Sequence, residues 1–222
     1  MKRSEINAII DDAKTFLDSM HFKLPSWAEW NSTDWKGKYG SVHEIADNRL
    51  GWDITDFGFG NYKKFGLFLF TIRNGNSAKD KKTYAEKVMI VDVGQENPMH
   101  FHWNKMEDII NRGGGDLAVQ LYHANGQEGL SDEDVTVSID GIERTVHAGD
   151  TVLLKNGESI CLVPFIYHRF YAIGSRCLMG EVSMINDDKT DNRFLESIGR
   201  FPAIEEDETP RHLLVSDYKE YL

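Results

Sequence analysis

The sequence has few cysteines and no long apolar run. Cys161 and Cys177 are the two cysteines among 222 residues, and each lies in an apolar, strand-like stretch. Two cysteines in such stretches indicate free, buried thiols in a reducing compartment rather than a disulfide framework. No stretch approaches the roughly 20 apolar residues that cross a membrane, and the N-terminus is charged where a signal peptide would be apolar. These absences predict a cytoplasmic protein.

Basic residues are also in deficit. Lysine and arginine number 25 against 36 aspartates and glutamates, which gives a net charge of -11. This balance argues against nucleic acid or an anionic membrane as a partner, and it leaves cations and neutral small molecules. The length suits a single domain, and no repeat or linker divides the chain. We therefore expect one domain over residues 1–222, with residues 1–62 as a helical and loop extension packed on the main body.

The first part of the chain predicts a helix followed by irregular structure. Apolar residues recur at helical spacing between Ile6 and Met20, with Ser4 placed as the N-cap, so we expect an amphipathic helix that ends near His21. Residues 27–62 are rich in Trp, Gly and Asp without a clear period. This composition indicates loops and short elements that cover a pocket.

From Phe65 onward, short strand-like runs alternate with turn residues. Asp140 and Gly141 stand between two alternating runs, which is typical of a hairpin because both positions tolerate positive φ. The glycines of residues 112–115 are interpreted as a turn between strands, and residues 191–214 as a short helix and an extended acidic segment. Many short strands with little helix between them predict a mainly β protein, with an antiparallel sandwich or barrel.

Two histidines stand one residue apart in the stretch PMHFHW, residues 98–103. In a strand, the side chains of His100 and His102 project from the same face, whereas on a helix they diverge by roughly 200°. A chain that turns back after Asn104 brings Glu107 beside them. Two imidazoles and a carboxylate would then converge as a site for a divalent first-row metal. The alternative is a pair of histidines satisfied by backbone carbonyls on a strand edge.

The spacing of these residues resembles that of a known motif. The run that begins at Gly94, contains His100, His102 and Glu107, and ends at Gly114 is similar to the first cupin motif at every anchor position. The resemblance implies a small antiparallel β-barrel, or jelly roll, whose interior holds a metal bound by the two histidines and the glutamate. It also implies a further histidine ligand on a later strand.

His168 is the residue that this resemblance assigns as the further ligand. Its distance from Gly157 is that of the second cupin motif, although Pro164 stands one place late and Ala172 replaces an expected asparagine. These departures concern the geometry of the turn more than the ligand. Three histidines and one glutamate, with positions left for water or substrate, suit Mn²⁺, Fe²⁺, Co²⁺ or Zn²⁺.

A longer stretch is similar to one particular cupin family. Residues 84–115, YAEKVMIVDVGQENPMHFHWNKMEDIINRGGG, together with residues 66–75 and 180–194, resemble the D-lyxose isomerase family, and the resemblance extends over nearly the whole chain. It implies a cupin barrel with an N-terminal helix and short flanking helices, and a homodimer is common for such barrels. The implied reaction interconverts D-lyxose and D-xylulose, with D-mannose and D-fructose as a related pair, and the implied metal is Mn²⁺.

Aldose–ketose isomerisation requires an acid–base group beside C1 and C2, and Lys87 and Glu181 are the candidates. A divalent ion that binds both sugar oxygens would polarise the carbonyl and stabilise an enediolate. Each candidate lies on an otherwise apolar strand face, where an ionisable group is costly unless it is paired or functional. Glu181 is the predicted base and Lys87 its electrostatic partner or a proton donor. The alternative places both at strand ends in contact with water.

Five further residues are candidates for binding the sugar. Asp191 and Arg193 would contact its hydroxyls or, alternatively, form a salt bridge at the barrel mouth. Trp52, Trp103 and Phe170 would offer flat surfaces to the sugar C–H groups, although aromatic side chains more often belong to a core. No phosphate-binding loop is recognisable, so a free sugar is favoured over a sugar phosphate. Rival interpretations are a sugar-phosphate isomerase, an iron-dependent cupin dioxygenase and a non-catalytic sugar-binding cupin.

Overall fold

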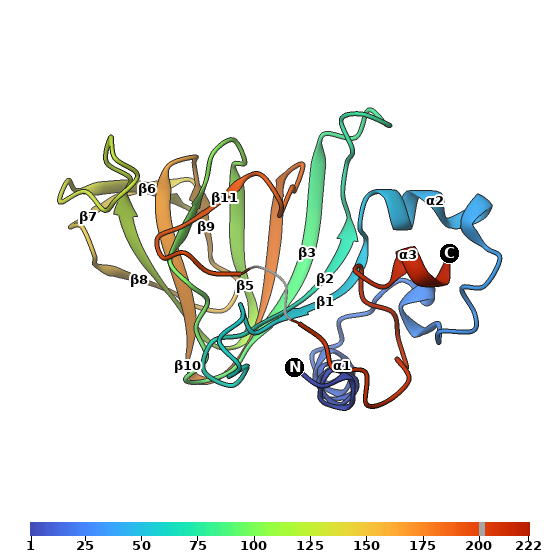
Figure 1. Cartoon of the computed structure of the whole chain (residues 1–222). Coiled ribbons are helices and arrows are strands. Elements are labelled where there is room, and N and C mark those ends of the chain that lie inside the picture. The colour runs from blue at the N-terminus through green and yellow to red at the C-terminus, as the bar shows by residue number, and fades with distance from the viewer. Residues whose placement is uncertain (200–202) are drawn as a thin grey trace.

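The computed structural model describes residues 1–199 and 203–222. Its strands form one antiparallel sheet that curls into a barrel, with the helices gathered beside β1 to β3 (Figure 1). The elements are, in chain order, α1 (Arg3–Ser19), η1 (Ser26–Glu29), α2 (Tyr39–Asp47), β1 (Gly51–Thr55), β2 (Leu67–Arg73), β3 (Tyr84–Val91), β4 (His100–His102), β5 (Glu107–His123), β6 (Val135–Ile139), β7 (Ile142–Val146), β8 (Thr151–Leu154), β9 (Ser159–Leu162), β10 (Ile166–Met184), β11 (Asn192–Phe194) and α3 (Tyr218–Tyr221). Among the described residues, no helix has both the length and the apolar character needed to cross a membrane.

The two long strands β5 and β10 form the centre of the sheet. β10 pairs with β3 on one side and with β5 on the other. Alternate residues of β5, such as Leu117, Val119 and Leu121, are fully buried in the barrel interior. The expected hairpin at Asp140 and Gly141 joins β6 to β7, and both residues have positive φ. The mainly β, antiparallel barrel predicted from the sequence is confirmed.

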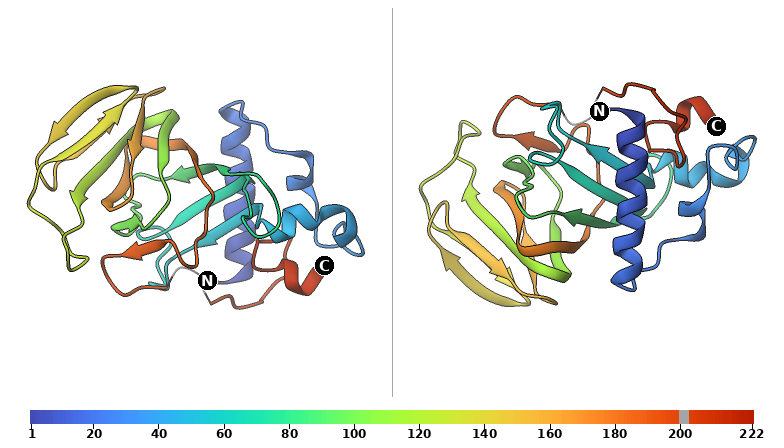
Figure 2. Two further views of the ribbon diagram at one scale, coloured as in Figure 1. Left: turned by 90° about the horizontal axis from the view of Figure 1, so that it is seen from above. Right: turned by 90° about the horizontal axis from the view of Figure 1, so that it is seen from below.

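Helix α1 lies across one face of the sheet, outside the barrel (Figure 2). Ile6, Ile10 and Leu17 recur at helical spacing and are buried in a second core with Phe68 and Phe70 of β2. Burying one such aliphatic side chain contributes about 1.5–3 kcal/mol. The apolar stripe of the predicted amphipathic helix therefore holds α1 to the sheet.

The ends of α1 differ slightly from the prediction. The helix begins at Arg3, so the expected cap, Ser4, lies inside it and donates its hydroxyl to Asp207 instead. The helix ends at Ser19, two residues earlier than expected. The buried Arg3 guanidinium forms an ion pair with Asp217 at 3.0 Å. The start of the helix is thereby tied to the C-terminal segment.

One further segment agrees with the prediction and another differs from it. Residues 27–62, expected to hold loops and short elements, contain helix α2 and strand β1, whose five residues all pair with β2. Residues 191–214 begin with a strand rather than a short helix, because Asn192–Phe194 pairs with His100–His102. Residues 200–202 of that segment lie outside the described residues. Strand β4, which is remote in sequence, supplies the backbone hydrogen bonds of Asn192–Phe194.

The glycine run expected to be a turn lies inside β5. Gly113 and Gly114 have φ of +141° and +91°, and opposite them the register of β10 shifts between Ile173 and Cys177. A Cβ atom on Gly114 would lie 2.2 Å from the carbonyl oxygen of Arg176. The run is therefore a β-bulge at which two backbones approach closely.

Gly114→Ala is expected to lower the free energy of unfolding by about 3 kcal/mol, because the methyl group would meet backbone at an unfavourable φ. Gly174→Ala is the matched control: its φ of +83° is also unfavourable, but nothing lies within 4 Å of the added Cβ. The control should lose about 1 kcal/mol. Urea denaturation followed by circular dichroism measures both. Equal losses would show that the close backbone approach does not matter.

Candidate active site

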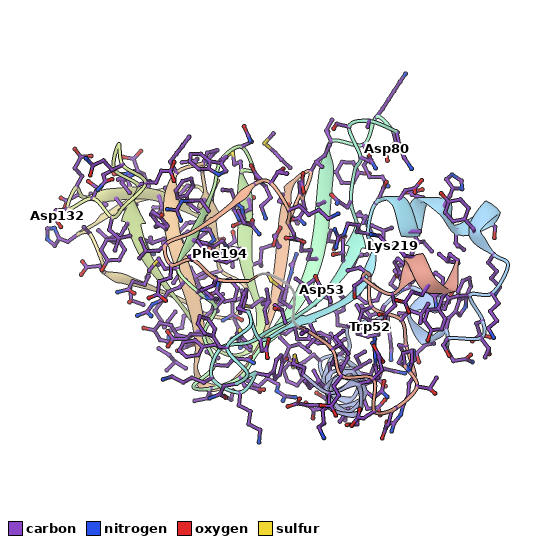
Figure 3. The ribbon with its side chains drawn as sticks, viewed as in Figure 1. Trp52, Asp53, Asp80, Asp132, Phe194 and Lys219 are labelled. Atoms are coloured by element: carbon purple, nitrogen blue, oxygen red, sulfur yellow. The ribbon has the colours of Figure 1, made fainter. Side chains whose placement is uncertain are left out.

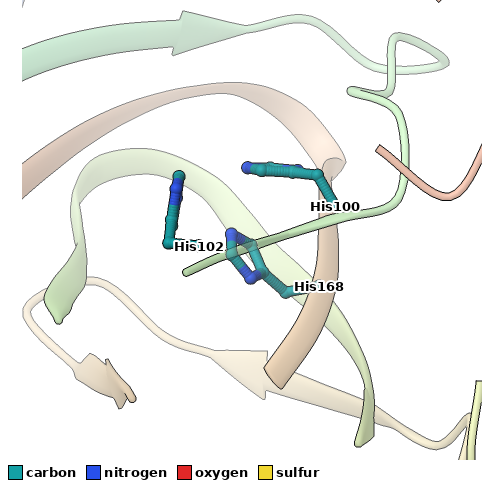
Figure 4. A group of neighbouring side chains, drawn as sticks. All are labelled: His100, His102 and His168. Atoms are coloured by element: carbon teal, nitrogen blue, oxygen red, sulfur yellow. The ribbon is translucent and has the colours of Figure 1, made fainter. Parts of the chain in front are cut away.

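Three histidines meet in the interior of the barrel (Figure 4). His100 and His102 lie on β4, and His168 of β10 is the direct strand partner of His100. The ligand atoms of the three rings all lie within 4.8 Å of one another. The alternation of β4 puts its two histidines on one face, and strand pairing adds the third ring beside them.

Backbone carbonyls fix the orientation of two of the rings. Nδ1 of His100 donates to the carbonyl of Pro98 at 2.9 Å, and Nδ1 of His168 donates to the carbonyl of Ile166 at 3.0 Å. A carbonyl oxygen only accepts, so Nδ1 carries the proton and Nε2 of a neutral imidazole keeps its lone pair. Burial and the two neighbouring imidazoles hold the pKa of His100 well below its usual value. The carbonyl contacts thus leave Nε2 available to bind a ligand.

Glu107, the first residue of β5, completes the group. Its Oε1 lies 3.3 Å from Nε2 of His102 and 3.2 Å from Nε2 of His168. Ligand atoms about 2.1 Å from one ion lie roughly 3.0–3.4 Å apart, so this spacing fits a shared cation. Burial opposes ionisation of Glu107, but Lys105 and His102 hold its pKa well below the usual value. Nε2 of His168 keeps its lone pair, and a carboxylate oxygen that faces such a lone pair is repelled unless a cation lies between them, so the donor set fits a divalent metal.

A charged cluster, formed by Lys87, Lys105, Glu107 and Glu181, lies beside the histidines. Lys87 and Glu181 are direct partners in the pairing of β3 with β10, and Nζ lies 3.1 Å from Oε1. Nζ of Lys105 lies 2.7 Å from Oε2 of Glu107 and 2.9 Å from Oε1 of Glu181. All four side chains are at most 5% exposed. At such depth an unpaired charge is costly, and here two positive charges balance two negative ones.

Within the cluster, charge pairing keeps Lys105, Glu107 and Glu181 ionised. Burial raises the pKa of Glu181, but the ammonium groups of Lys105 and Lys87 together hold it below its usual value. Burial lowers the pKa of Lys105, but Glu107 and Glu181 together raise it above its usual value. The cavity therefore contains a carboxylate that can accept a proton and an ammonium group that can stabilise a negatively charged oxygen.

Sequence reasoning missed Lys105, because the residue lies in the turn between β4 and β5 rather than in a strand. A signal was nevertheless present. Lys105 stands two residues before Glu107, and Met106 between them is exposed. Alternation of this kind places Lys105 on the same side of the chain as the Glu107 carboxylate.

Comparison with known proteins places these features in a family. A family model described as D-lyxose isomerase matches residues 1–218. The chain belongs to the D-lyxose isomerase family. Two relatives named D-lyxose/D-mannose isomerase, from Escherichia coli O157:H7 and Serratia proteamaculans, are 45% and 44% identical to it, with 100% of each chain covered.

Solved structures show the same fold. An L-ribose isomerase of Cellulomonas parahominis without ligand has a TM-score of 0.61 and 16% identity, with 92% of this chain and 98% of that chain covered. The L-ribose isomerase of Acinetobacter sp. DL28 in complex with L-ribose gives a TM-score of 0.61 at 15% identity, with the same coverage. At such identities the likeness concerns the fold alone. It confirms the cupin barrel expected from the sequence.

Of the three aromatic residues that the sequence suggested for sugar binding in this member of the D-lyxose isomerase family, one lines the cavity and two do not. Phe170 lines the cavity that contains the histidines and the charged cluster. Trp52 lies in the second core near α1, where its Nε1 donates to the carbonyl of Ala28 at 3.1 Å, and Figure 3 shows it well apart from the barrel interior. Trp103 packs edge-on against Phe101, with ring centroids 4.7 Å apart. Neither tryptophan is part of the cavity lining.

Asp191 and Arg193 also make contacts outside the cavity lining. The carboxylate of Asp191 accepts from the backbone N–H groups of Asn104 and Lys105 at 2.8 and 3.0 Å. It thereby holds the turn that presents Lys105 to the cavity. Arg193 forms an ion pair with Glu128 at 2.7 Å, so its partner is not Asp191, with which the sequence had suggested a salt bridge.

Two phenylalanines that the sequence did not single out cover the cavity. Phe57 follows β1 and Phe194 ends β11, and their ring centroids lie 5.9 Å apart. The ring of Phe194, which is labelled in Figure 3, lies 5.6 Å from that of His100. These two rings and Phe170 supply the aromatic part of the apolar wall of the site. Phe194 escaped notice because its segment was expected to be helical.

Proposed function

We propose that the protein is a divalent-metal-dependent aldose–ketose isomerase that interconverts D-lyxose with D-xylulose and D-mannose with D-fructose. Membership of the D-lyxose isomerase family and the names of the two relatives support these substrates. The observation that carries the proposal is the contact of Lys105 with both Glu181 and Glu107. An acid–base group and a metal-binding group thus share one cavity, as isomerisation requires.

The residues that would hold the metal are His100, His102, Glu107 and His168. A bound divalent ion supplies positive charge beside the carbonyl oxygen and the adjacent hydroxyl oxygen of the sugar. We propose Mn²⁺ as the preferred ion, and the same imidazole and carboxylate donors also accept Co²⁺, Fe²⁺ or Zn²⁺.

Glu181 is the proposed base, and its two oxygens differ. Oε1 accepts from Lys105 at 2.9 Å, from Lys87 at 3.1 Å and from the Ser183 hydroxyl at 3.1 Å. Oε2 has a longer contact, 3.3 Å from Nζ of Lys87. Oε2 therefore keeps more of its capacity to accept, and we assign to it the proton that moves between C1 and C2.

The other cavity residues complete the chemistry. Lys87 and Lys105 place ammonium groups near sugar oxygens that gain negative charge as the proton leaves carbon. Phe57, Phe170 and Phe194 exclude water and offer flat surfaces to the sugar C–H groups. Removing water from the site strengthens each of these electrostatic interactions.

The test is an assay of ketose formation by metal-stripped protein, before and after addition of MnCl₂, across free and phosphorylated aldoses. D-lyxose and D-mannose should give ketose after the metal is added, without consumption of oxygen. No ketose from either sugar would overturn the proposal. Oxygen uptake would point to the dioxygenase, and turnover confined to phosphorylated aldoses would point to a sugar-phosphate isomerase.

Three expectations from the sequence stay predictions. The protein is expected to form a homodimer, to be located in the cytoplasm, and to act on a small molecule rather than to bind a nucleic acid or a membrane.

A further inference from the structure

A chain of asparagine side chains leads from helix α2 to the two lysines of the active site. It comprises Asn48 at the C-terminal end of α2, Asn74 after β2 and Asn186 after β10. Asn48 and Asn74 are only 4% and 5% exposed. Amides at such depth are costly unless they are hydrogen-bonded, so their contacts define how these three segments fit together.

Asn186 ends this chain at the charged cluster. Its Oδ1 accepts from Nζ of Lys87 at 2.5 Å and from Nζ of Lys105 at 3.3 Å. The contact of Lys87 with Asn186 is shorter than its contacts with the two oxygens of Glu181, at 3.1 and 3.3 Å. An amide carbonyl carries no net charge, so Asn186 orients both ammonium groups without changing the charge balance of the cluster.

Asn74 holds the backbone of Asn186. Its Oδ1 accepts from the backbone N–H of Asn186 at 3.0 Å, and its Nδ2 donates to the carbonyl of Asn186 at 3.0 Å. Two such bonds fix both the position and the orientation of the peptide. The next residue, Gly75, has no space for a side chain, because a Cβ atom would lie 1.9 Å from the carbonyl oxygen of Lys82. This segment is therefore packed tightly against its neighbour.

Asn48 anchors Asn74 in turn. Nδ2 of Asn48 donates to the carbonyl of Asn74 at 2.9 Å, and Nδ2 of Asn74 donates to the carbonyl of Asn48 at 3.2 Å. Nδ2 of Asn48 also donates to Asp80 at 2.8 Å. Hydrogen bonds thereby join the segments that contain Asn48, Asn74 and Asn186, and the last of these segments places Asn186 at the active site.

We propose that Asn186 is a positioning residue for the isomerisation, an inference that rests on the proposed function. Asn186 draws Lys87 away from Oε2 of Glu181, so that this oxygen stays free to take the substrate proton. Without Asn186, the buried ammonium of Lys87 keeps Glu181 as an acceptor and moves onto both oxygens of that carboxylate. The base is then blocked, while the metal-binding residues and the apolar wall are unchanged.

Asn186→Ala is expected to lower kcat for D-lyxose by about 10- to 100-fold, with KM within about twofold of wild type and bound metal unchanged. Asn186→Ser, whose hydroxyl is too short to reach Lys87, should show the same loss and serves if the alanine variant folds poorly. A kcat within about twofold of wild type would overturn the proposal, as would a loss confined to KM or to metal content. If the wild-type protein itself forms no ketose, the proposed function fails and this inference fails with it.

A double-mutant cycle separates positioning from a general loss of stability. Asn74→Ala should lower kcat on its own but cause no further loss in the Asn186→Ala background, because Asn74 acts through Asn186. Asn76→Ala is the matched control, since Asn76 lies in the same loop and donates to the carbonyl of Asp47 at 3.4 Å rather than to Asn186. Its kcat should equal that of wild type. Equal losses of kcat from Asn74→Ala in both backgrounds would show that Asn74 does not act through Asn186.

Discussion

Glu181→Gln is expected to lower kcat for aldose isomerisation by about 10³-fold, while the content of bound metal stays at the wild-type level. A glutamine amide fills the same space but takes no proton at the position of Oε2. The measurement is ketose formation from D-lyxose in D₂O, alongside metal analysis, and deuterium in the wild-type product would support proton transfer rather than a hydride shift. A kcat within about tenfold of wild type would remove Glu181 as the base.

Glu86→Gln is the matched control for this variant. Glu86 pairs with Val182, the neighbour of Glu181, but it forms a partly exposed ion pair with Arg73 at 3.2 Å. Loss of the Glu86 charge should leave kcat within about twofold of wild type.

Glu181→Gln also leaves two buried ammonium groups with one carboxylate, so the free energy of unfolding of this variant should fall by about 3 kcal/mol. Urea denaturation gives the folded fraction by which kcat is corrected.

His168→Ala should lower the affinity for Mn²⁺ by at least about 100-fold and abolish ketose formation at micromolar metal. Residues that only support a metal ligand contribute about 10- to 100-fold to affinity, so removal of a ligand itself costs at least as much. Equilibrium dialysis followed by elemental analysis measures the affinity. Activity should return in part at millimolar MnCl₂ if the remaining three ligands still gather.

His147→Ala is the control for the histidine variant. His147 is 84% exposed and bonded to Asp134 at 2.9 Å, outside the cavity lining. Its removal should change neither metal content nor kcat. Unchanged metal affinity in His168→Ala would take that residue out of the metal site and leave its contact with Glu107 without a function.

The grouping of the proposed metal ligands was largely predictable from the sequence, because it depends on local periodicity. His100 and His102 share a face in any strand, and Glu107 follows after a short return of the chain. His168 lies on a strand remote in sequence, so its assignment depends on its distance from Gly157 in the motif resemblance. The structure brings all four side chains together.

Residues whose position depends on long-range pairing were not predictable. Lys105 and Asn186 reach the active site from turns, whose path no hydrophobic period specifies. Phe194 covers the cavity because β11 pairs with β4, whereas Trp52 on β1 packs into the second core near α1. An aromatic side chain favours burial, but composition does not say which of two cores receives it.

The register shift of β10 opposite the glycine bulge of β5 also decides which side of the sheet His168 and Glu181 face. His168 and Glu181 are 13 positions apart, an odd number, so strict alternation would turn one inward and the other outward. In the barrel core, however, the β10 side chains have even numbers up to Ala172 and odd numbers from Cys177 onward. Deleting one residue from 174–176 would restore strict parity and turn Glu181 out of the barrel with every reacting side chain still present.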